Sequence, residues 1–314
     1  MFVIRVLKWA FITVSVLFVL CFSYLNYVIL SFDTERLPEN HGVVKTELFL
    51  GEGDRRPLIV GFGGGEGGNA WAGKYAAKHR DLLRENGYAF LAVAYFGTDG
   101  LPANLDRVAV DSVHKAIMEV SQHRQINRNC IVPMGVSRGS ELALLLASRY
   151  EDYKGAIGIV PGSSVFASIT DAMTTSGFSL NGEPLPFVPV PWSAAPALIT
   201  GDLRAAFEKM MKNDEAMYAA AIPVENIKGP VLFVSAANDE QWPSMKMSES
   251  MMRRLKSAGF DYPHQHISLE GGHGEYHDNF DKIISFLNAN FREKNNVDCG
   301  PQGADEPAPV GNPS

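Results

Sequence analysis

Residues 130–149, CIVPMGVSRGSELALLLASR, hold the stretch that decides the fold. An apolar β-type run leads into Gly-Val-Ser-Arg-Gly at positions 135–139, and a helical pattern begins at once. This order of strand, turn and helix is the context that a G-x-S-x-G nucleophile elbow requires. The turn is tight and strained, so it needs glycine on both sides, and Gly135 and Gly139 meet that need. We expect Ser137 to present its hydroxyl above a sheet, although a serine here would also serve as a simple helix cap.

An acyl-transfer serine needs a general base, and that base needs an acid to orient it. On this kind of sheet the acid follows a later strand, and the histidine comes after it in the chain. Residues 230–241, PVLFVSAANDEQ, contain an apolar strand, Val231–Ala236, that leads into the polar side chains of residues 238–240. We predict Asp239 as the acid because it lies nearest the strand end, with Glu240 and Asn238 as alternatives.

The expected histidine follows in the required order. Residues 264–274, HQHISLEGGHG, read as a strand that ends in a glycine-rich loop presenting His273. One helix and one strand fit between Asp239 and His273, so both loops should emerge at the same sheet edge as the serine. A metal site built from His273 with His264, His266 and His277 is the weaker interpretation, because no acidic or cysteine partner has ligand spacing to them.

A glycine-rich loop follows an earlier strand and suits an oxyanion hole. Residues 57–68, PLIVGFGGGEGG, place six glycines within eight positions. Such a loop lets backbone N–H groups point inward, so we expect the Arg138 N–H and the N–H of Gly63 or Gly64 to bind the oxyanion. The Arg138 side chain itself would either attract an anionic substrate group or be solvated. A dinucleotide site is disfavoured because strand 88–94 lacks the acidic end that its fingerprint requires.

These segments resemble the C-terminal catalytic domain of acyl-CoA thioesterases and bile-acid-CoA:amino-acid N-acyltransferases. The resemblance rests on PLIVGFGGGEGG, GYAFLAVAYFGTDGLPANLD, GVSRGSELALLLAS, IPVENIKGPVLFVSAANDEQWPS and GGHG, spread over residues 57–277. It implies an α/β-hydrolase fold, a triad of Ser137, Asp239 and His273, and acyl thioesters as the substrate class, with no cofactor or metal. That family usually carries a β-sandwich domain ahead of this one, whereas about 25 residues lie here between Asp33 and Pro57.

Two other functions stay open. Dienelactone hydrolases and other carboxylesterases share the same framework, so a carboxylesterase or lactonase is the first alternative. A catalytically inactive, membrane-tethered binding module is the second. The serine itself favours hydrolysis over conjugation to an amine, because its acyl-enzyme is an oxygen ester that water attacks once His273 activates it.

Strands and helices alternate along the chain, which predicts a doubly wound, mostly parallel sheet with helices on both faces. Residues 57–294 would form this domain. The segment 163–222 is too long for a simple connection, and its proline-rich apolar stretch suggests either a lid or a rigid excursion. The final residues, 295–314, are rich in Pro and Gly, so we expect disorder. Predicted helices include Trp71–Glu85, Leu105–Gln122 and Leu203–Ala220.

The N-terminus predicts attachment to a membrane. Arg5 and Lys8 precede Trp9–Phe32, which are 24 residues without a charge. This length suffices to cross a bilayer and exceeds the apolar core of a usual signal peptide. We expect an uncleaved signal anchor over 1–32, a linker and first strand over 33–56, and the catalytic domain on the non-cytoplasmic side. A cleaved signal peptide is the alternative.

Composition narrows the remaining choices. The chain has 314 residues, 46% of them hydrophobic, enough for one large α/β core. Its net charge of −7 argues against a nucleic-acid surface. Of the three cysteines, Cys21 lies in the anchor, Cys130 in a core strand and Cys299 in the tail, so we expect no disulfide framework.

Overall fold

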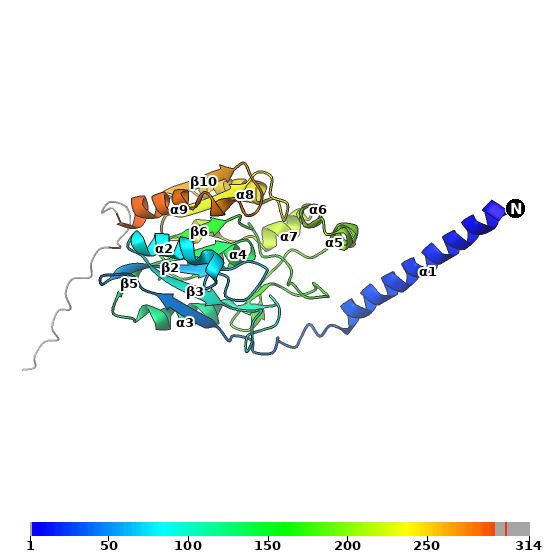
Figure 1. Cartoon of the computed structure of the whole chain (residues 1–314), viewed down its shortest axis with the longest axis horizontal. Coiled ribbons are helices and arrows are strands. Elements are labelled where there is room, and N and C mark those ends of the chain that lie inside the picture. The colour runs from blue at the N-terminus through cyan, green and yellow to red at the C-terminus, as the bar shows by residue number, and fades with distance from the viewer. Residues whose placement is uncertain (1, 293–298, 300–314) are drawn as a thin grey trace, which may run out of the picture.

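We describe the fold from a computed structural model, which covers residues 2–292 and Cys299. A seven-stranded sheet forms the centre of the globular part and is flanked by helices (Figure 1). Neighbouring strands run parallel except at one edge, where the first strand is antiparallel to its neighbour. In spatial order the strands are β1 (Lys45–Phe49), β3 (Ala89–Ala94), β2 (Arg56–Phe62), β5 (Ile126–Val136), β6 (Ala156–Ile159), β9 (Val231–Ala236) and β10 (His264–Leu269).

Each face of the sheet is covered by its own set of helices, because strand side chains alternate between the faces. In β2, Leu58 and Val60 belong to one buried apolar cluster, and Ile59 belongs to the other. This arrangement confirms the predicted α/β-hydrolase sheet with helices on both faces. The first cluster is completed by α3 (Val110–Ser121), α4 (Arg138–Arg149) and α8 (Ser244–Ser257), and the second by α2 (Ala77–Glu85) and α9 (Phe280–Leu287). The 3-10 helices η1 (Lys74–Ala76) and η4 (Glu275–His277) precede α2 and α9, and the π-helix η5 (Asn288–Arg292) extends α9.

Two predicted helices begin later than expected. The helix expected at Trp71 begins only at η1, because Gly73 adopts an extended conformation with φ −63° and ψ 163°. The helix expected at Leu105 begins at Val110, because Val108 and Ala109 form β4 (Val108–Ala109) and pair with a strand of the inserted segment. Tertiary pairing therefore overrides the helical periodicity at this second start.

The segment 163–222 builds a small structure beside the main sheet. Its strands β7 (Phe178–Leu180) and β8 (Glu183–Pro184) join β4 in a second, three-stranded sheet. Phe166 and Met210 pack with Trp242 in a separate buried cluster, so Met210 fills a core as expected for a helical methionine. Its helical elements are η2 (Trp192–Ala194), α5 (Ala195–Thr200), α6 (Leu203–Met210) and α7 (Asp214–Ala219), and η3 (Val224–Asn226) follows.

The single helix predicted over Leu203–Ala220 is two helices. The break falls between α6 and α7, where the Asn213 side chain accepts a hydrogen bond from the Ala216 backbone N–H at 3.0 Å. An asparagine in this position caps a new helix start, and it competes with continuation of the preceding helix. The N-cap signal therefore decided the local structure, and the apolar periodicity alone missed it.

A disulfide bond joins Cys130 and Cys299, which corrects the expectation of no disulfide framework. The two residues are 169 positions apart in sequence, and their Cα atoms lie 5.0 Å apart. The Asn127 side chain donates to the Cys299 carbonyl oxygen at 3.0 Å, so the backbone of Cys299 is held as well. Cys299 is thus tied to β5 rather than free in a disordered tail; the other residues from 295 on lie outside the described residues.

Helix α1 (Phe2–Ser31) precedes the globular part and extends away from it (Figure 1). It has 30 residues, and none of them is buried. Within the described residues, this is the one helix that is long and apolar enough to cross a membrane, and an N-terminal signal sequence would meet the same criteria.

Candidate active site

The turn between β5 and α4 has the geometry of a nucleophile elbow. Ser137 adopts φ 54° and ψ −124°, a conformation that costs a non-glycine residue about 1–3 kcal/mol. A Cβ on Gly135 would collide with the Gly139 backbone, and a Cβ on Gly139 would collide with the Gly63 carbonyl oxygen. The Ser137 backbone N–H donates to Ile159 at 2.9 Å, which anchors the turn to β6. Both glycines are therefore required by close backbone packing.

The Arg138 side chain does not face a substrate or solvent, which corrects the expectation for it. It is buried and lies 3.1 Å from the Glu141 carboxylate (Nε to Oε1), although these atoms are not aligned for a hydrogen bond. Its Nη2 donates to the Phe166 carbonyl oxygen at 3.2 Å. Burial raises the pKa of Glu141 to about 7, although the Arg138 charge and a hydrogen bond from the Phe166 N–H oppose that rise. Only the backbone N–H of Arg138 stays available as an oxyanion donor.

Asp239 and His273 lie side by side beyond the ends of β9 and β10. The His273 ring donates from Nδ1 to Asp239 Oδ1 at 2.8 Å, and Asp239 is fully buried. Ser244 Oγ donates to Oδ2 at 2.6 Å, and the backbone N–H groups of Gln241 and Trp242 donate to Oδ1 at 3.0 and 3.2 Å. Burial alone would raise the pKa of Asp239, but the hydrogen bonds from His273 and Ser244 outweigh it, so the pKa lies below its usual value.

The two alternative candidates, Glu240 and Asn238, contact the backbone of the histidine loop rather than the imidazole. Glu240 accepts a hydrogen bond from the His273 backbone N–H at 3.0 Å. The Asn238 backbone N–H donates to the Gly271 carbonyl oxygen at 3.1 Å. Asp239 is therefore the one of these three side chains that contacts the imidazole ring.

The predicted site residues gather at the edge where the parallel strands end. Gly63 and Gly64 follow β2, Ser137 follows β5, and Asp239 and His273 follow β9 and β10. Among the described residues, no hydrogen bond joins Ser137 to His273. Such bonds are often long before a substrate binds and tighten in the Michaelis complex.

The glycine loop lies directly beside the serine, and one of its backbone N–H groups donates a hydrogen bond to a carboxylate. A Cβ on Gly64 would lie 3.1 Å from the Ser137 Cβ. The Gly64 N–H donates to Glu66 Oε1 at 2.9 Å, and the Tyr95 hydroxyl donates to the Gly63 carbonyl oxygen at 2.6 Å. Burial, and then the Glu66 charge, raise the pKa of Tyr95, which therefore stays a hydrogen-bond donor. Glu66 was not predicted, although its place inside the glycine run was a visible signal.

A cavity of about 240 Å³ opens next to this loop. His79 and His277 line it with their rings 5.2 Å apart, and Tyr276 and Glu66 line it as well. Burial, and then the neighbouring His79, lower the pKa of His277, while burial and the Glu66 charge raise the pKa of Tyr276. No motif pointed to His79 or Tyr276 as site residues, because the loop after β2, helix α2 and the turn η4 bring these residues together from distant parts of the chain.

The histidines considered for a metal do not converge. His264 and His266 both lie on β10. The His266 ring forms a hydrogen bond with the Ser235 hydroxyl at 2.7 Å, and His264 Nδ1 lies 2.8 Å from the Tyr262 carbonyl oxygen. Within residues 2–292 and Cys299, no group of three or more His, Cys, Asp or Glu side chains is arranged to hold a metal ion.

Comparison with known proteins identifies relatives of this arrangement. A family model described as BAAT / Acyl-CoA thioester hydrolase C terminal matches residues 108–275, more than half of the chain. Mouse acyl-coenzyme A thioesterase 6 is 29% identical over 242 residues, which are 76% of this chain and 53% of that protein. Mouse peroxisomal succinyl-coenzyme A thioesterase is 27% identical over 241 residues, again 76% and 53%. The chain thus spans about half the length of these relatives, and the resemblance read from the sequence is confirmed.

Solved structures share the fold at low sequence identity. An acylaminoacyl peptidase from Pyrococcus horikoshii superposes with a TM-score of 0.55 at 17% identity, covering 83% of this chain and 41% of the peptidase. A puromycin-hydrolysing peptidase from Mycobacterium tuberculosis superposes with a TM-score of 0.53 at 16% identity, covering 78% and 37%. At these identities the likeness concerns the fold alone.

Proposed function

The chain belongs to the BAAT / acyl-CoA thioester hydrolase C-terminal family, and on that premise we propose that it is a serine hydrolase that cleaves acyl thioesters. The observation that carries the proposal is the 2.8 Å hydrogen bond between buried Asp239 and His273 at the same sheet edge as the strained Ser137. A nucleophile, a base and an orienting acid in this chain order are what acyl transfer requires.

In the proposed reaction, Ser137 Oγ attacks the acyl carbonyl carbon while His273 Nε2 accepts its proton. Asp239 keeps the Nδ1–H of His273 pointed at itself and stabilises the imidazolium that forms. The tetrahedral intermediate then expels the thiolate, which takes the proton from His273. Water then attacks the Ser137 ester while His273 Nε2 takes its proton, and His273 returns that proton to Ser137 Oγ as the carboxylic acid leaves.

Of the two candidate glycines, we assign the second oxyanion donor to Gly64. The Tyr95 hydroxyl holds the Gly63 carbonyl oxygen at 2.6 Å. In a trans peptide the N–H of the next residue points the opposite way, so the Gly64 N–H is directed away from Tyr95. Gly64 also approaches Ser137 closely. Together with the Arg138 N–H at the start of α4, it gives the oxyanion two backbone donors once Glu66 is displaced.

We further propose that α1 is an uncleaved anchor and that the domain lies on the non-cytoplasmic side. Arg5 and Lys8 at its N-terminal end favour that orientation. The Cys130–Cys299 disulfide agrees with it, because disulfides persist mainly in oxidising compartments. This same bond favours the second candidate function, a carboxylesterase or lactonase of the dienelactone-hydrolase type, because coenzyme A is a cytoplasmic carrier.

A comparison of substrates with the full-length protein in detergent micelles tests the proposal. Short- and long-chain acyl-CoA are assayed beside aryl esters of the same acyl chains, with wild type, Ser137→Ala and Ser250→Ala. Ser250 is exposed on α8, so it controls for the substitution itself. Thioester turnover above ester turnover, lost only in Ser137→Ala, is the expected result.

Two other outcomes have distinct meanings. Turnover of the esters alone, lost in Ser137→Ala, would refute the thioesterase proposal and support the carboxylesterase. Failure of a fluorophosphonate to label folded wild-type protein at Ser137 refutes both enzymes and favours the inactive binding module.

A further inference from the structure

The last turns of α1 lie against the inserted segment, and an apolar groove runs between them. The rings of Phe22 and Trp192 have centroids 5.5 Å apart. Phe22, Leu25 and Ile29 are spaced by three and four residues, so they share one face of α1. Leu25 and Ile29 line a cavity of about 400 Å³, whose opposite wall comes from residues 190–199.

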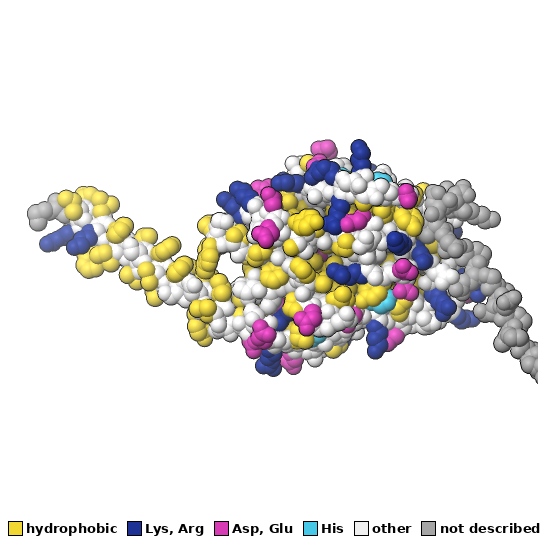
Figure 2. All heavy atoms as spheres, turned by 180° about the vertical axis from the view of Figure 1, so that it is seen from behind, with side chains coloured by type: hydrophobic (Ala, Val, Ile, Leu, Met, Phe, Trp, Pro, Cys, Tyr) yellow, Lys and Arg dark blue, Asp and Glu magenta, His cyan; other side chains and the backbone are white. Residues whose placement is uncertain are grey.

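Large apolar side chains at the rim of this groove face outward. Ile199 is 68% exposed and Trp192 is 52% exposed. Figure 2 shows apolar side chains that continue from α1 onto the part of the domain that this helix meets. A rim of this kind, continuous with a helix able to span a bilayer, suits contact with hydrocarbon rather than water.

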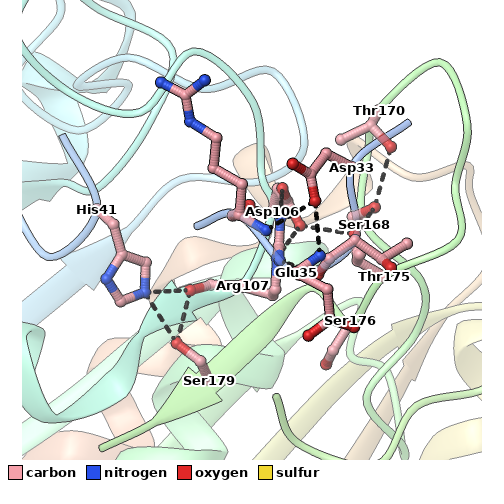
Figure 3. A network of polar contacts seen from close by, with 12 residues as sticks. Asp33, Glu35, His41, Asp106, Arg107, Ser168, Thr170, Thr175, Ser176 and Ser179 are labelled. Carbon is pink, nitrogen blue, oxygen red and sulfur yellow. Dashed lines mark hydrogen bonds and ion pairs between the residues drawn. The ribbon is translucent and has the colours of Figure 1, made fainter. Parts of the chain in front are cut away.

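A buried polar network fixes where α1 leaves the domain (Figure 3). Arg107 is 2% exposed and pairs with Asp106 at 2.9 Å. It also donates to the carbonyl oxygens of Thr34 and Arg36, at 2.6 and 2.8 Å, in the connection that follows α1. Thr175 of the inserted segment donates to the same Asp106 at 2.7 Å. Because a buried guanidinium is costly to leave without hydrogen-bond partners, the contacts of Arg107 with Thr34 and Arg36 hold the connection after α1 against the domain.

The length of α1 brings the groove to the depth of the bilayer surface. Its 30 residues are about 45 Å long, compared with about 30 Å of hydrocarbon. With Lys8 at the cytoplasmic interface, about 20 residues cross the hydrocarbon and end near Val28. Phe22 then lies about 9 Å inside that boundary, and Trp192 with it. Interfacial helices reach about the same depth, 5–10 Å.

The groove wall leads on toward the serine. Residues 171–174 line it, the exposed Asp171 among them, and Ile169, two positions before Asp171, is 39% exposed. The Ile169 Cδ1 atom lies 2.9 Å from where a Cβ on Gly65 would stand, so it covers the glycine loop. The preceding residue, Gly64, is the one that approaches Ser137. The inserted segment thus runs from the membrane-facing rim to the glycine loop beside the candidate nucleophile.

We propose that this groove takes the acyl chain of a bilayer lipid, a long-chain ester or thioester, and guides its carbonyl carbon to Ser137. The inference rests on the proposed function and names the substrate class of that same site. Each methylene of an acyl chain is costly to expose to water. A groove that starts at the bilayer surface therefore favours long, membrane-resident chains over soluble ones.

The test uses the full-length protein in phosphatidylcholine vesicles with two substrates in parallel. One is a water-soluble butyrate aryl ester, and the other is a long-chain fluorogenic lipid ester within the vesicle. The variant Ile199→Glu places a charge on the rim, and Tyr218→Glu places the same charge on an 86% exposed side chain of α7, elsewhere on the inserted segment.

We expect Ile199→Glu to lower turnover of the vesicle lipid about tenfold or more, with butyrate turnover within twofold of wild type. Tyr218→Glu should change neither rate. Equal losses on both substrates, or an unchanged lipid rate in Ile199→Glu, overturn the groove as an acyl passage. If Ser137→Ala retains butyrate turnover, the proposed function itself fails. This outcome can be told apart from failure of the groove, which the Ile199→Glu variant tests.

A second readout needs no catalysis. Brominated lipids quench tryptophan fluorescence within the hydrocarbon region, so the difference in quenching between wild type and Trp192→Phe reports the depth of Trp192. Strong quenching of that difference signal is expected, whereas a signal quenched only by water-soluble iodide would place the rim outside the bilayer and refute the proposal.

Discussion

Replacing Asp239 with Asn tests the electrostatic part of the proposed mechanism. The substitution keeps the shape of a fully buried side chain and removes its charge. Asp239 Oδ1 receives three of the four hydrogen bonds, from His273 Nδ1 and from two backbone N–H groups, whereas Oδ2 receives only Ser244 Oγ. An Asn that keeps its oxygen at the Oδ1 position still accepts from His273, and its amide faces the Ser244 oxygen. The imidazole therefore keeps its tautomer and loses only the facing charge.

The size of the effect follows from the distance between the two groups. The His273 Nδ1 and Asp239 Oδ1 atoms are 2.8 Å apart, which places the charge centres of imidazolium and carboxylate about 4 Å apart. At an effective dielectric constant of about 20, two unit charges at this distance attract by about 4 kcal/mol. Since about 1.4 kcal/mol is a factor of ten in rate, kcat/KM should fall about 1,000-fold.

Steady-state kinetics on an aryl ester measure this fall in kcat/KM, with Glu240→Gln as the matched control for Asp239→Asn. Glu240 accepts a hydrogen bond from the His273 backbone N–H and not from its ring, so the Glu240→Gln variant should lose less than about tenfold in kcat/KM. Thermal unfolding of both variants shows whether they fold. An Asp239→Asn enzyme that is folded and within tenfold of wild type refutes the reasoning, and a larger loss in Glu240→Gln transfers the role of the acid to Glu240.

Three further predictions concern groups that only the structure reveals. Removing the Glu66 carboxylate, as in Glu66→Ala, should raise kcat/KM about tenfold, because substrate no longer displaces a charge-assisted hydrogen bond from the Gly64 N–H; a lower rate would mean that Glu66 supports the site. Cys299→Ser opens a loop closed across 169 residues and should lower the free energy of unfolding by about 3–5 kcal/mol. Wild type with dithiothreitol should match that variant in urea denaturation, and a difference of less than about 1 kcal/mol between oxidised wild type and Cys299→Ser contradicts the prediction. The folded protein holds the Glu141 proton up to pH about 7, whereas the unfolded chain releases it near 4.5, so the free energy of unfolding should fall with rising pH across this window, on the order of 3 kcal/mol from this group. Urea midpoints at pH 5 and pH 8 should show a smaller fall in Glu141→Gln, and identical falls would exclude this origin.

The elements of the central sheet were predictable because their signals are local. Apolar runs such as Val231–Ala236 leave a strand few other places than a buried sheet, and the structure has this strand with the predicted bounds. Gly135 and Gly139 predict the elbow because both are required by close backbone packing, within the turn itself and against the neighbouring glycine loop. Chain order then restricts the acid and the histidine, since parallel strands bring their carboxyl ends to one edge.

The choice between candidate residues that are neighbours in sequence required the tertiary structure. Asp239 contacts the imidazole of His273, 34 residues away in sequence, whereas Glu240 and Asn238 do not. This choice depends on how the two loops that carry these residues meet. The same holds for Arg138, whose burial against Glu141 and the Phe166 carbonyl oxygen cannot be read from its place in a helical turn.

The sequence by itself determined the fold class, the elbow and the order of the predicted site residues, because spacing, glycine positions and apolar periodicity are properties of short segments. Only the tertiary structure decided the Cys130–Cys299 bond, the engagement of Gly64 by Glu66 and the groove between α1 and the inserted segment. Each of these joins groups that no sequence period relates, and each depends on packing that places them within a few ångströms. Packing free energy is the sum of many weak contacts over the whole chain, and no local pattern encodes that sum.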